Sequence, residues 1–483
     1  MSRPSDAGST DVVQRVLCVD LDGTLIRTDL FAESLLLLLK RHALYSLMLP
    51  LWWLRGRAFL KQAIAQRVSV NYAQLPYRTD VLAFLKQERE RGVPIILATA
   101  CDRRLALGVA DHLSLFAEIH ASDGHTNLKG RRKADLLAER FGSAGFIYLG
   151  DSPADLPVWR RAAAAVVVGA SSSLKDRVAR EVPIERVFDE DKGSHFFALV
   201  RAMRPHQWLK NLLLFVPLVA AHKIADIHAW SEAAQGFAVM CLVTASIYMA
   251  NDLLDLEADR LHRSKRQRPF AGGQVSVWAG ITAVPLLLMA GLLLALPLRS
   301  GFVAWVCAYA VAALAYSLRL KHVAIVDVLT LAALYAVRLL AGAAAIAVPM
   351  SEWLLAFSLF FFLSLALLKR VEELVANRDK ASTAPVRGYR HSDLQFVAIL
   401  GIASGLVAVL VMALYINSRE VTVLYSHPEW LWGFCPSLLY WISRVWLLAW
   451  RGEMHEDPIL FAATDGSSYM VLTVLGVCMF LAS

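Results

Sequence analysis

The feature that most constrains the fold is a series of long apolar segments that begins near residue 207. We expect about nine membrane spans, because most of the segments approach the roughly 20 residues that a helix needs to cross a bilayer. The first of them is weakened by Pro217. The expected spans lie near 207–222, 232–254, 275–298, 301–318, 325–347, 351–369, 394–416, 430–450 and 466–482. The sequence therefore predicts an all-α membrane domain.

The basic residues of the loops predict how this domain is oriented. The loops at 255–274, 319–324 and 369–393 hold 13 Lys or Arg residues, whereas the loops at 223–231, 299–300, 348–352 and 417–429 hold 3. Cytoplasmic loops are the ones enriched in Lys and Arg. The same enrichment explains the net charge of +8 without a nucleic-acid partner. The first residues are polar and lack the apolar core of a signal peptide. We expect a multi-pass inner or plasma membrane protein whose N-terminal residues face the cytosol.

Residues 1 to about 195 follow a different pattern, in which short apolar runs alternate with helical segments. Such alternation is typical of an α/β domain with a parallel sheet and right-handed crossovers, here of the Rossmann-like kind. The expected strands are 16–21, 93–100, 146–151 and 164–169, separated by helices around 78–91, 102–113 and 132–141. We therefore divide the chain into an α/β domain, 1–195, and a membrane domain, 196–483.

One segment of the first domain, residues 35–54, is about as apolar as a membrane span. A single crossing there would separate DLDGT (20–24) from GDSPAD (150–155), whose carboxylates we expect to act together. We therefore interpret 31–70 as a helical insert. It either lies on the membrane interface or against the membrane domain, or it is an ordinary buried helical cap.

Two carboxylates, Asp20 and Asp22, follow the first expected strand. Side chains two apart on an extended segment face the same side. One carboxylate could then attack phosphorus while the other handles the proton of the leaving group. Further polar residues follow later strands or open a helix, in the order Thr99, Lys133, Asp151 and Asp155.

This ordered set resembles the four motifs of the haloacid-dehalogenase (HAD) phosphatase superfamily, across roughly residues 15–190. The resemblance implies that Asp20 is a nucleophile that forms an aspartyl-phosphate and that Asp22 is the general acid and base. It implies that Thr99 and Lys133 hold phosphoryl oxygens, with Lys129 as the alternative lysine. The expected Mg²⁺ ligands are Asp20, Asp22, Asp151 and Asp155.

A charged stretch, NDLLDLEADRLHRSKRQRP at 251–269, separates the second and third expected spans. On a helix, Asp252, Asp255 and Asp259 are spaced by three and four residues and share one face, where like charges repel. A divalent cation such as Mg²⁺, with phosphate oxygens as its other ligands, would relieve that repulsion. Asn251 joins the expected ligands. The basic residues that follow, suited to an anion on that metal, are Arg260, Lys265, Arg266 and Arg268.

This stretch resembles the NDxxDxxxD signature of the UbiA-type intramembrane prenyltransferases. The segments MRPHQWLKNLLLFVPL (203–218) and YSLRLKHVAIVDVLTLAALYAVRLLAGA (316–343) strengthen the resemblance, which covers about 200–483. The chain is most similar to the branch that makes polyprenyl-phosphate phosphoribose. The resemblance implies transfer of 5-phosphoribose from 5-phosphoribosyl diphosphate to a polyprenyl phosphate such as decaprenyl phosphate.

The chain departs from the wider family after the sixth span, where other members carry a second aspartate-rich motif. Here the stretch reads LLKRVEELVANRDK, with Lys369, Arg370, Glu372 and Glu373. Partial replacement of acids by bases weakens the case for a second prenyl-diphosphate metal site and suits two phosphorylated substrates.

Basic residues at span ends and within spans would position the two anions. For those at span ends, snorkelling to the interface is the alternative, whereas Arg338 lies well inside a span and should face a cavity. The expected substrate-binding residues outside the charged stretch are Arg204, Lys210, Arg319, Lys321, Arg338, Lys369, Arg370 and Glu373.

Together these features predict a bifunctional membrane enzyme whose phosphatase domain removes the 5′-phosphate from the product of the transferase domain. The expected partners are phosphoribosyl diphosphate, a polyprenyl phosphate lipid and the bilayer, and the homo-oligomeric state stays open. One alternative is prenylation of an aromatic acceptor from a prenyl diphosphate. Another is an inactive or regulatory HAD module that tethers a partner, and a third is a transporter.

Overall fold

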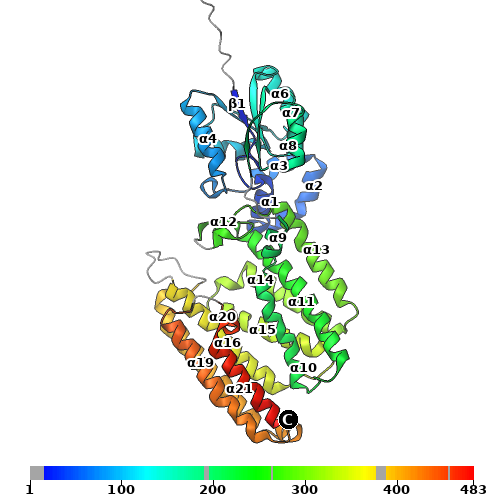
Figure 1. Ribbon diagram of the computed structural model, residues 1–483, viewed down its shortest axis with the longest axis vertical. Coiled ribbons are helices and arrows are strands. Elements are labelled where there is room, and N and C mark those ends of the chain that lie inside the picture. Colours follow the sequence, from blue (N-terminus) through cyan, green and yellow to red (C-terminus); the bar gives the residue numbers. More distant parts are fainter. Residues whose placement is uncertain (1–15, 190–194, 263–264, 377–387, 455–456) are drawn as a thin grey trace, which may run out of the picture. The chain divides into compact units, whose positions relative to one another are not determined.

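The computed structural model describes residues 16–189, 195–262, 265–376, 388–454 and 457–483 (Figure 1). Residues 1–15, and 377–387 of the predicted basic loop, lie outside this range, and so do 263–264. The chain forms two compact units. The first comprises Met1–Ala202 with Met249–Thr282, and the second comprises Met203–Tyr248 with Ala283–Ser483.

The first unit contains a six-stranded sheet in the order β3-β2-β1-β4-β5-β6, and all its pairings are parallel. The α/β prediction is confirmed. The strands are β1 Val16–Val19, β2 Ile95–Asp102, β3 Glu118–Ser122, β4 Phe146–Gly150, β5 Ala164–Val168 and β6 Ile184–Phe188. Val19 pairs with Leu97 on one side and Leu149 on the other, so the carboxyl ends of β1, β2 and β4 meet at one edge.

Alternate strand residues point to opposite faces of the sheet, and each face has its own apolar core. Val19 and Leu97 belong to one core, whereas Cys18 and Ile96 belong to the other. The helices between and after the strands are α4 Thr79–Glu90, α5 Arg103–Leu113, α6 Arg131–Phe141, α7 Leu156–Trp159, α8 Ser172–Ala179 and α9 His195–Ala202.

The segment 31–70 is a helical insert, as predicted, and consists of α1 Leu30–Arg41, η1 Ala43–Met48, α2 Leu49–Leu54 and α3 Arg57–Ala65. Trp52 and Ile64 pack in a small core of the insert itself. Leu44, Leu47 and Leu54 are 83%, 75% and 76% exposed. The insert is therefore not an entirely buried cap.

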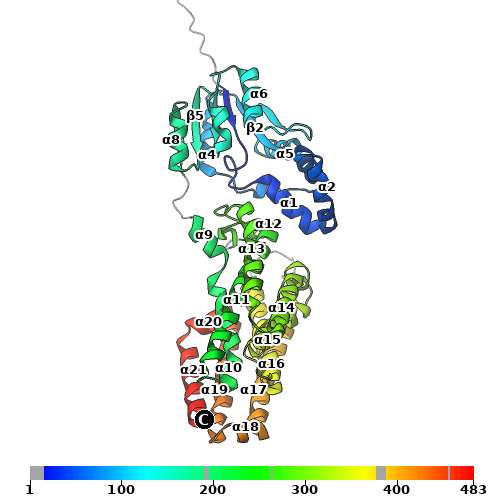
Figure 2. The same ribbon diagram turned by 90° about the vertical axis from the view of Figure 1, so that its right-hand side faces the viewer.

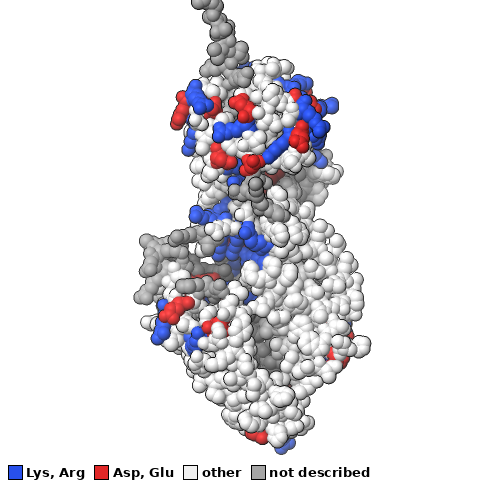
Figure 3. Space-filling model, in the orientation of Figure 1, with Lys and Arg blue, Asp and Glu red and all other residues white. Residues whose placement is uncertain are grey.

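Six helices among the described residues are long and apolar enough to cross a membrane. Five are single helices, α11 Ile227–Leu254, α13 Val277–Ala295, α14 Ser300–Leu318, α15 Val326–Ala345 and α16 Glu352–Ala376, and the sixth, His391–Ile416, joins η7 His391–Asp393 to α17 Leu394–Ile416. Helices α19 Phe434–Trp450 and α21 Gly466–Ala482 have 17 residues each. Figure 2 shows α14 to α17 running alongside one another, and Figure 3 shows few charged side chains on the flank of the second unit. The chain is a membrane protein.

The first predicted span, 207–222, is not a helix of membrane length. It divides into the 3₁₀ helix η4 Pro205–Phe215 and the five-residue α10 Val216–Ala220, in which Pro217 lies in the first turn. Gly342 of α15 explains how η4 packs, because a Cβ there would lie 2.3 Å from the carbonyl oxygen of Leu214. Small residues allow such close approach of backbones in membrane proteins. The shorter elements between and after the spans are η6 Leu320–His322, α18 Arg419–Leu424, η8 Pro428–Gly433 and α20 Pro458–Thr464.

Candidate active sites

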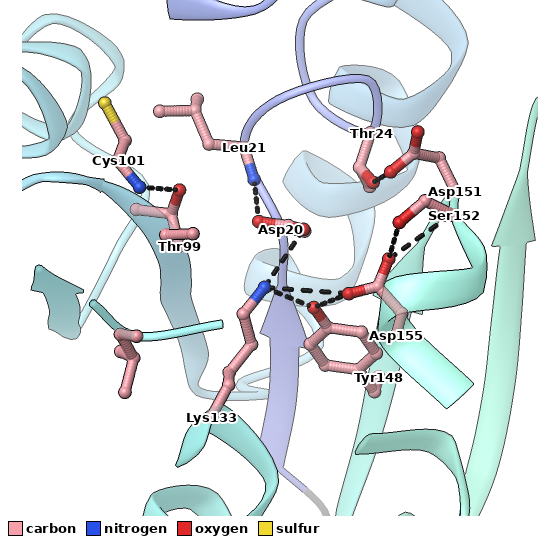
Figure 4. Close-up of polar contacts among 12 residues, drawn as sticks. Asp20, Leu21, Thr24, Thr99, Cys101, Lys133, Tyr148, Asp151, Ser152 and Asp155 are labelled. Carbon is pink, nitrogen blue, oxygen red and sulfur yellow. Dashed lines mark hydrogen bonds and ion pairs between the residues drawn. The ribbon is translucent and has the colours of Figure 1, made fainter. Parts of the chain in front are cut away.

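The first candidate site lies at the carboxyl edge of the sheet, around the end of β1 (Figure 4). From β1 the chain builds β2 and β3 on one side and then crosses to β4 on the other. Such a reversal of strand order opens a crevice at the carboxyl ends, where open α/β sheets bind ligands. Asp20 directly follows β1 and Asp151 directly follows β4.

Lys133 of α6 reaches into this edge and contacts Asp20. Its Nζ lies 3.0 Å from Asp20 Oδ2 and 3.6 Å from Asp155 Oδ1, and the side chain is 2% exposed. The Lys133 ammonium also donates to the Tyr148 hydroxyl (2.8 Å), which donates to Asp155 (2.9 Å). Lys129 lines the same cavity. Lys133 is thus the lysine placed at Asp20.

Asp20, Asp151 and Asp155 form a group that fits a divalent cation. Each offers a carboxylate oxygen, and these oxygens all lie within 4.8 Å of one another. The Thr24 hydroxyl donates to Asp151 (3.1 Å), while the backbone N–H and hydroxyl of Ser152 donate to Asp155 (3.2 and 3.0 Å). A donor set made only of oxygens, clustered this closely, suits Mg²⁺.

Gly23 lies where the loop after β1 comes close to Asp151, and this close approach requires a glycine. Its φ is +78°, and a Cβ there would lie 2.2 Å from Asp151 Oδ2. Any other residue would be strained at this φ and would displace either the loop that carries Asp22 or the Asp151 carboxylate.

The carboxyl groups hold their protons more tightly than usual. Burial raises the pKa of Asp151 to about 8, and Asp155 and Asp20 add to the effect. Burial likewise raises the pKa of Asp20 and, with the neighbouring Asp29, that of Asp22. The pKa of Lys133 is raised because the attraction of Asp20 and Asp155 outweighs burial. A bound cation would therefore stabilise the ionised form of these carboxyl groups.

Asp22 and Thr99 are placed differently from the group of three. Asp22 lines the cavity, and its Oδ1 accepts from the backbone N–H of Leu30 at the start of α1 (2.8 Å). Among the described residues, the carboxylates grouped closely enough for a metal are those of Asp20, Asp151 and Asp155, without Asp22. Thr99 is fully buried, and its hydroxyl accepts from the N–H of Cys101 (3.0 Å).

The cavity at Asp20 measures about 410 Å³ and includes cations that sequence reasoning missed. Arg78 is 3% exposed and donates from Nε to the Gly23 carbonyl (3.1 Å). Lys61 of α3 donates to the Ala100 carbonyl (2.6 Å). Both residues lie in or beside the insert and outside the motifs, and their local sequence does not indicate that they line a cavity.

The second candidate site is the aspartate-rich segment, also in the first unit. Helix α11 ends at Leu254 and α12 spans Leu256–Leu261, with Asp255 at the junction. The N–H of Asp259 still donates to the carbonyl of Asp255 (2.8 Å), so the helical spacing is kept across the junction. Asp252 and Asp259 are 2% and 3% exposed. Both contact Nη1 of Arg268, at 3.1 and 2.6 Å.

The other predicted residues of this segment lie apart from that contact. Asp255 Oδ1 is 3.4 Å from Lys40 of α1. Arg260 donates two hydrogen bonds to Glu33 of α1, at 2.9 and 2.6 Å. Asn251 is half-buried in the last turn of α11, and η5 (Lys265–Gln267) carries the half-buried Lys265 and the exposed Arg266.

In the second unit, two predicted lysines meet at a carboxylate that sequence reasoning missed. Lys210 and Lys369 both lie 2.7 Å from Asp457 Oδ2. Burial opposes ionisation of Asp457, but the two ammonium groups hold its pKa well below the usual range. A single aspartate before α20 had no motif to mark it.

Arg338 is the buried cation of this unit predicted to face a cavity. It is 3% exposed and donates to Asn211 (3.0 Å) and to the Tyr309 hydroxyl (2.8 Å). Its guanidinium also lies 5.5 Å from the centre of the Tyr335 ring, and the ammonium of Lys210 lies 5.7 Å from the same ring. Arg338 and Lys210 thus share one aromatic neighbour.

Arg370 and Glu373 belong to a different cluster. Arg370 Nε lies 2.6 Å from Asp327 Oδ2, and Arg370 also contacts Glu373. The Tyr389 hydroxyl donates to Asp327 (2.5 Å). Of the remaining predicted residues, Arg204 lies 5.5 Å from the centre of the Tyr248 ring, Arg319 is exposed and Lys321 is 9% exposed.

Comparison with known proteins matches both parts of the chain. The UbiA prenyltransferase family matches residues 212–463, and the haloacid dehalogenase-like hydrolase family matches residues 17–160. The uncharacterized protein y4nM of Sinorhizobium fredii is 38% identical over 458 residues, which cover 94% of this chain and 88% of that protein. The nodulation protein NoeC of Azorhizobium caulinodans is 35% identical, over 59% of this chain and 92% of that protein. The decaprenyl-phosphate phosphoribosyltransferase of Mycolicibacterium smegmatis is 36% identical, over 46% of this chain and 71% of that protein.

Proposed function

This chain belongs to the UbiA prenyltransferase family and carries a haloacid dehalogenase-like domain, and from that premise we propose a bifunctional membrane enzyme. The transferase part moves 5-phosphoribose from phosphoribosyl diphosphate to a polyprenyl phosphate at the cytosolic face. The HAD-like part then removes the 5′-phosphate. The observation that carries the proposal is that one compact unit contains two clusters of carboxylates, each around a basic side chain. Lys133 contacts Asp20 in the first cluster, and Arg268 contacts Asp252 in the second.

The transferase step is supported by the convergence of Asp252 and Asp259 on Arg268. Two buried carboxylates at the Arg268 guanidinium create a position where positive charge is strongly favoured. With Asp255 and Asn251 beside them in sequence, they would hold Mg²⁺ once these side chains are drawn together around the ion and its diphosphate ligand. The metal would stabilise the departing diphosphate. Arg268 would then be released to bind the same anion. The C1–O bond to diphosphate breaks, and an oxygen of the lipid phosphate forms the new bond to C1.

A lipid phosphate as the acceptor is supported by two features of the second unit. Three positive charges are available, on Lys210, Lys369 and Arg338, and Asp457 neutralises one of them. A cavity of about 450 Å³ has an apolar lining that includes Phe215, Trp353 and Met412. Cations suit the phosphate, and an apolar cavity suits a polyprenyl chain. The mycobacterial relative is named for a reaction with such substrates.

The phosphatase step follows from the group around Asp20. A bound Mg²⁺ would neutralise charge on the phosphoryl oxygens. Asp20 attacks phosphorus, and the bond from phosphorus to the 5′-oxygen breaks as Asp22 supplies a proton to that oxygen. Water then hydrolyses the aspartyl-phosphate while Asp22 takes up a proton, which releases inorganic phosphate. Lys133, 3.0 Å from Asp20, opposes the effects of burial and of Asp155, which raise the pKa of the nucleophile.

The test uses the full chain in detergent with labelled phosphoribosyl diphosphate, decaprenyl phosphate and Mg²⁺. We expect the wild type to form labelled polyprenyl-phosphate ribose. Asp20→Asn should accumulate the 5-phosphorylated lipid. Asp252→Asn should form no glycolipid but should still dephosphorylate the phosphorylated lipid when it is added.

The matched control is Asp176→Asn, an exposed aspartate of α8, which should behave as wild type. Transfer from a prenyl diphosphate to an aromatic acid, without labelled lipid, would favour the aromatic-acceptor alternative. Absence of phosphate release from any sugar phosphate would favour a regulatory HAD module. Loss of glycosyl transfer in folded Asp20→Asn would contradict two steps in sequence.

A further inference from the structure

Part of the lining of the cavity at Asp20 lies outside the residues that match the HAD-like family. That match ends at residue 160, and the cavity is also lined by Gly273, Gln274, Ser276 and Trp278. These residues lie within the UbiA match and within the first compact unit. Gly273, Gln274 and Ser276 lie between α12 and α13, and Trp278 lies in the first turn of α13. We call this stretch, residues 268–278, the 268–278 loop. The loop is therefore part of both the transferase sequence and the phosphatase cavity.

Trp278 lines the cavity and is held there by Asp29 and Phe31, at the start of α1. Its Nε1 donates to Asp29 Oδ2 (3.1 Å), and its ring centre lies 6.0 Å from that of Phe31. Asp29 also caps α1 by accepting from the N–H of Ala32 (2.8 Å). The next residue, Leu30, donates its N–H to Asp22 (2.8 Å). The indole and the proposed general acid are thus fixed to the same turn.

The rest of the loop is fitted to the cavity in the same way. Gly273 has φ +70°, and a Cβ there would lie 2.6 Å from the Cβ of Arg27. The Gln274 carbonyl lies 3.3 Å from His195 Nδ1, and its side-chain oxygen accepts from Arg201. These contacts fix the loop at both its backbone and its side chains, so it can act as a wall.

We propose that this loop, with Trp278 as its main contact, binds the sugar part of the phosphatase substrate. The inference rests on the proposed function and names the part of the chain that selects the substrate. Lys133 and the carboxylate group take the phosphate end, so the alcohol part must face the remaining lining. An indole ring offers an apolar face to a sugar ring, while Gln274 and Ser276 offer neutral hydrogen-bonding groups suited to hydroxyls.

The same loop begins at Arg268, which contacts Asp252 and Asp259. Ten residues along the chain, Trp278 lines the phosphatase cavity. The phosphatase pocket is complete only with this piece of the transferase sequence. The structure therefore assigns preference for a phosphoribosylated substrate, rather than for small phosphate esters in general, to Trp278.

The experiment compares Trp278→Ala with Trp230→Ala in the full chain. Trp230 is a matched control, because the two residues are 38% and 39% exposed and Trp230 Nε1 also has an acceptor, the Ile224 carbonyl. Two substrates are used with Mg²⁺: 5-phosphoribosylated decaprenyl phosphate, and acetyl phosphate, which carries no sugar. Trp278→Ala should lower kcat/KM for the lipid about tenfold, mainly through KM. Its activity on acetyl phosphate should stay within about twofold of wild type, as should Trp230→Ala on both substrates.

A binding measurement keeps the inference testable without turnover. In an Asp20→Asn background, calorimetry of the phosphoribosylated lipid should show about tenfold weaker binding for Trp278→Ala and no change for Trp230→Ala. Equal losses on both substrates, or unchanged binding, would overturn the inference. A wild type that hydrolyses neither substrate, yet binds the lipid in a Trp278-dependent way, would instead overturn the proposed phosphatase step. Trp278→Phe, which keeps an aromatic face, should lie between wild type and Trp278→Ala in a protein with an unchanged unfolding temperature.

Discussion

The ionisation of Asp151 should depend on a bound cation. Without one, burial and the carboxylates of Asp155 and Asp20 raise its pKa to about 8. Below that pH the carboxyl group holds a proton that Mg²⁺ must displace, and above it the competition disappears. Mg²⁺ affinity at this site should therefore rise with pH, by up to about tenfold per unit between roughly pH 6 and 8.

Calorimetry of Mg²⁺ binding in buffers of different ionisation enthalpy would measure this proton release. The full-length Asp252→Asn variant confines the measurement to the site at Asp20. Binding at pH 6.5 should release close to one proton. Affinity that does not change between pH 6 and 8 would contradict the raised pKa.

Lys133 and Lys129 provide a second test at the residue scale. Lys133 is buried, 3.0 Å from Asp20, whereas Lys129 is exposed and lines the same cavity. Lys133→Met should lower phosphatase turnover by at least about a hundredfold, because the charge that supports Asp20 and the phosphoryl oxygens is lost. Lys129→Met should lower it less than about tenfold. Steady-state phosphate release checks both, and a larger loss for Lys129→Met would exchange the two roles.

At the scale of elements, the insert helix α1 is joined to α12 by ion pairs that differ in burial. Arg260 and Glu33 are 7% and 5% exposed as side chains, and Glu33 also accepts from Thr28 (2.5 Å). Arg41 and Glu257 are 45% and 27% exposed. Removing one partner of a buried pair leaves an uncompensated charge and costs about 3–5 kcal/mol, whereas an exposed pair contributes about 0–1 kcal/mol.

Arg260→Met should therefore lower the unfolding temperature of the first unit by several degrees, and Arg41→Met should change it little. Thermal unfolding of the purified chain, followed by protease sensitivity of the insert, would compare them. Adding Glu33→Gln to Arg260→Met should recover part of the loss, because the buried charge is then removed. Equal effects of Arg260→Met and Arg41→Met would mean that the Glu33 pair is solvated.

At the scale of the whole molecule, the proposed cytosolic position of the active sites can be tested through two histidines. His391 lies in a basic loop and His427 in a loop poor in Lys and Arg, and both are exposed. In a cysteine-free background, a maleimide that cannot cross membranes should label His427→Cys in intact cells. It should label His391→Cys only after the membrane is opened. The reverse pattern would place both proposed active sites on the opposite face.

Much of the fold and of the first site could be predicted from the sequence, because these features depend on local patterns. Continuous apolar runs marked β1, β2, β4 and β5, which are buried on both faces. Strands β3 and β6 escaped prediction, since edge strands are partly exposed and their residues alternate less clearly. Positions directly after strands were enough to bring Asp20 and Asp151 to one edge.

Only the tertiary structure decided how distant segments meet. Residues 249–282 pack in the unit of the sheet, although the sequence assigns them to the membrane part. Arg260 therefore contacts Glu33, 227 positions away, and the segment that ends in Trp278 lines the cavity at Asp20. Hydropathy and motif spacing depend only on residues that are close together in the chain, so they predict local structure. Charge pairing across such a separation depends on packing, and no local pattern records it.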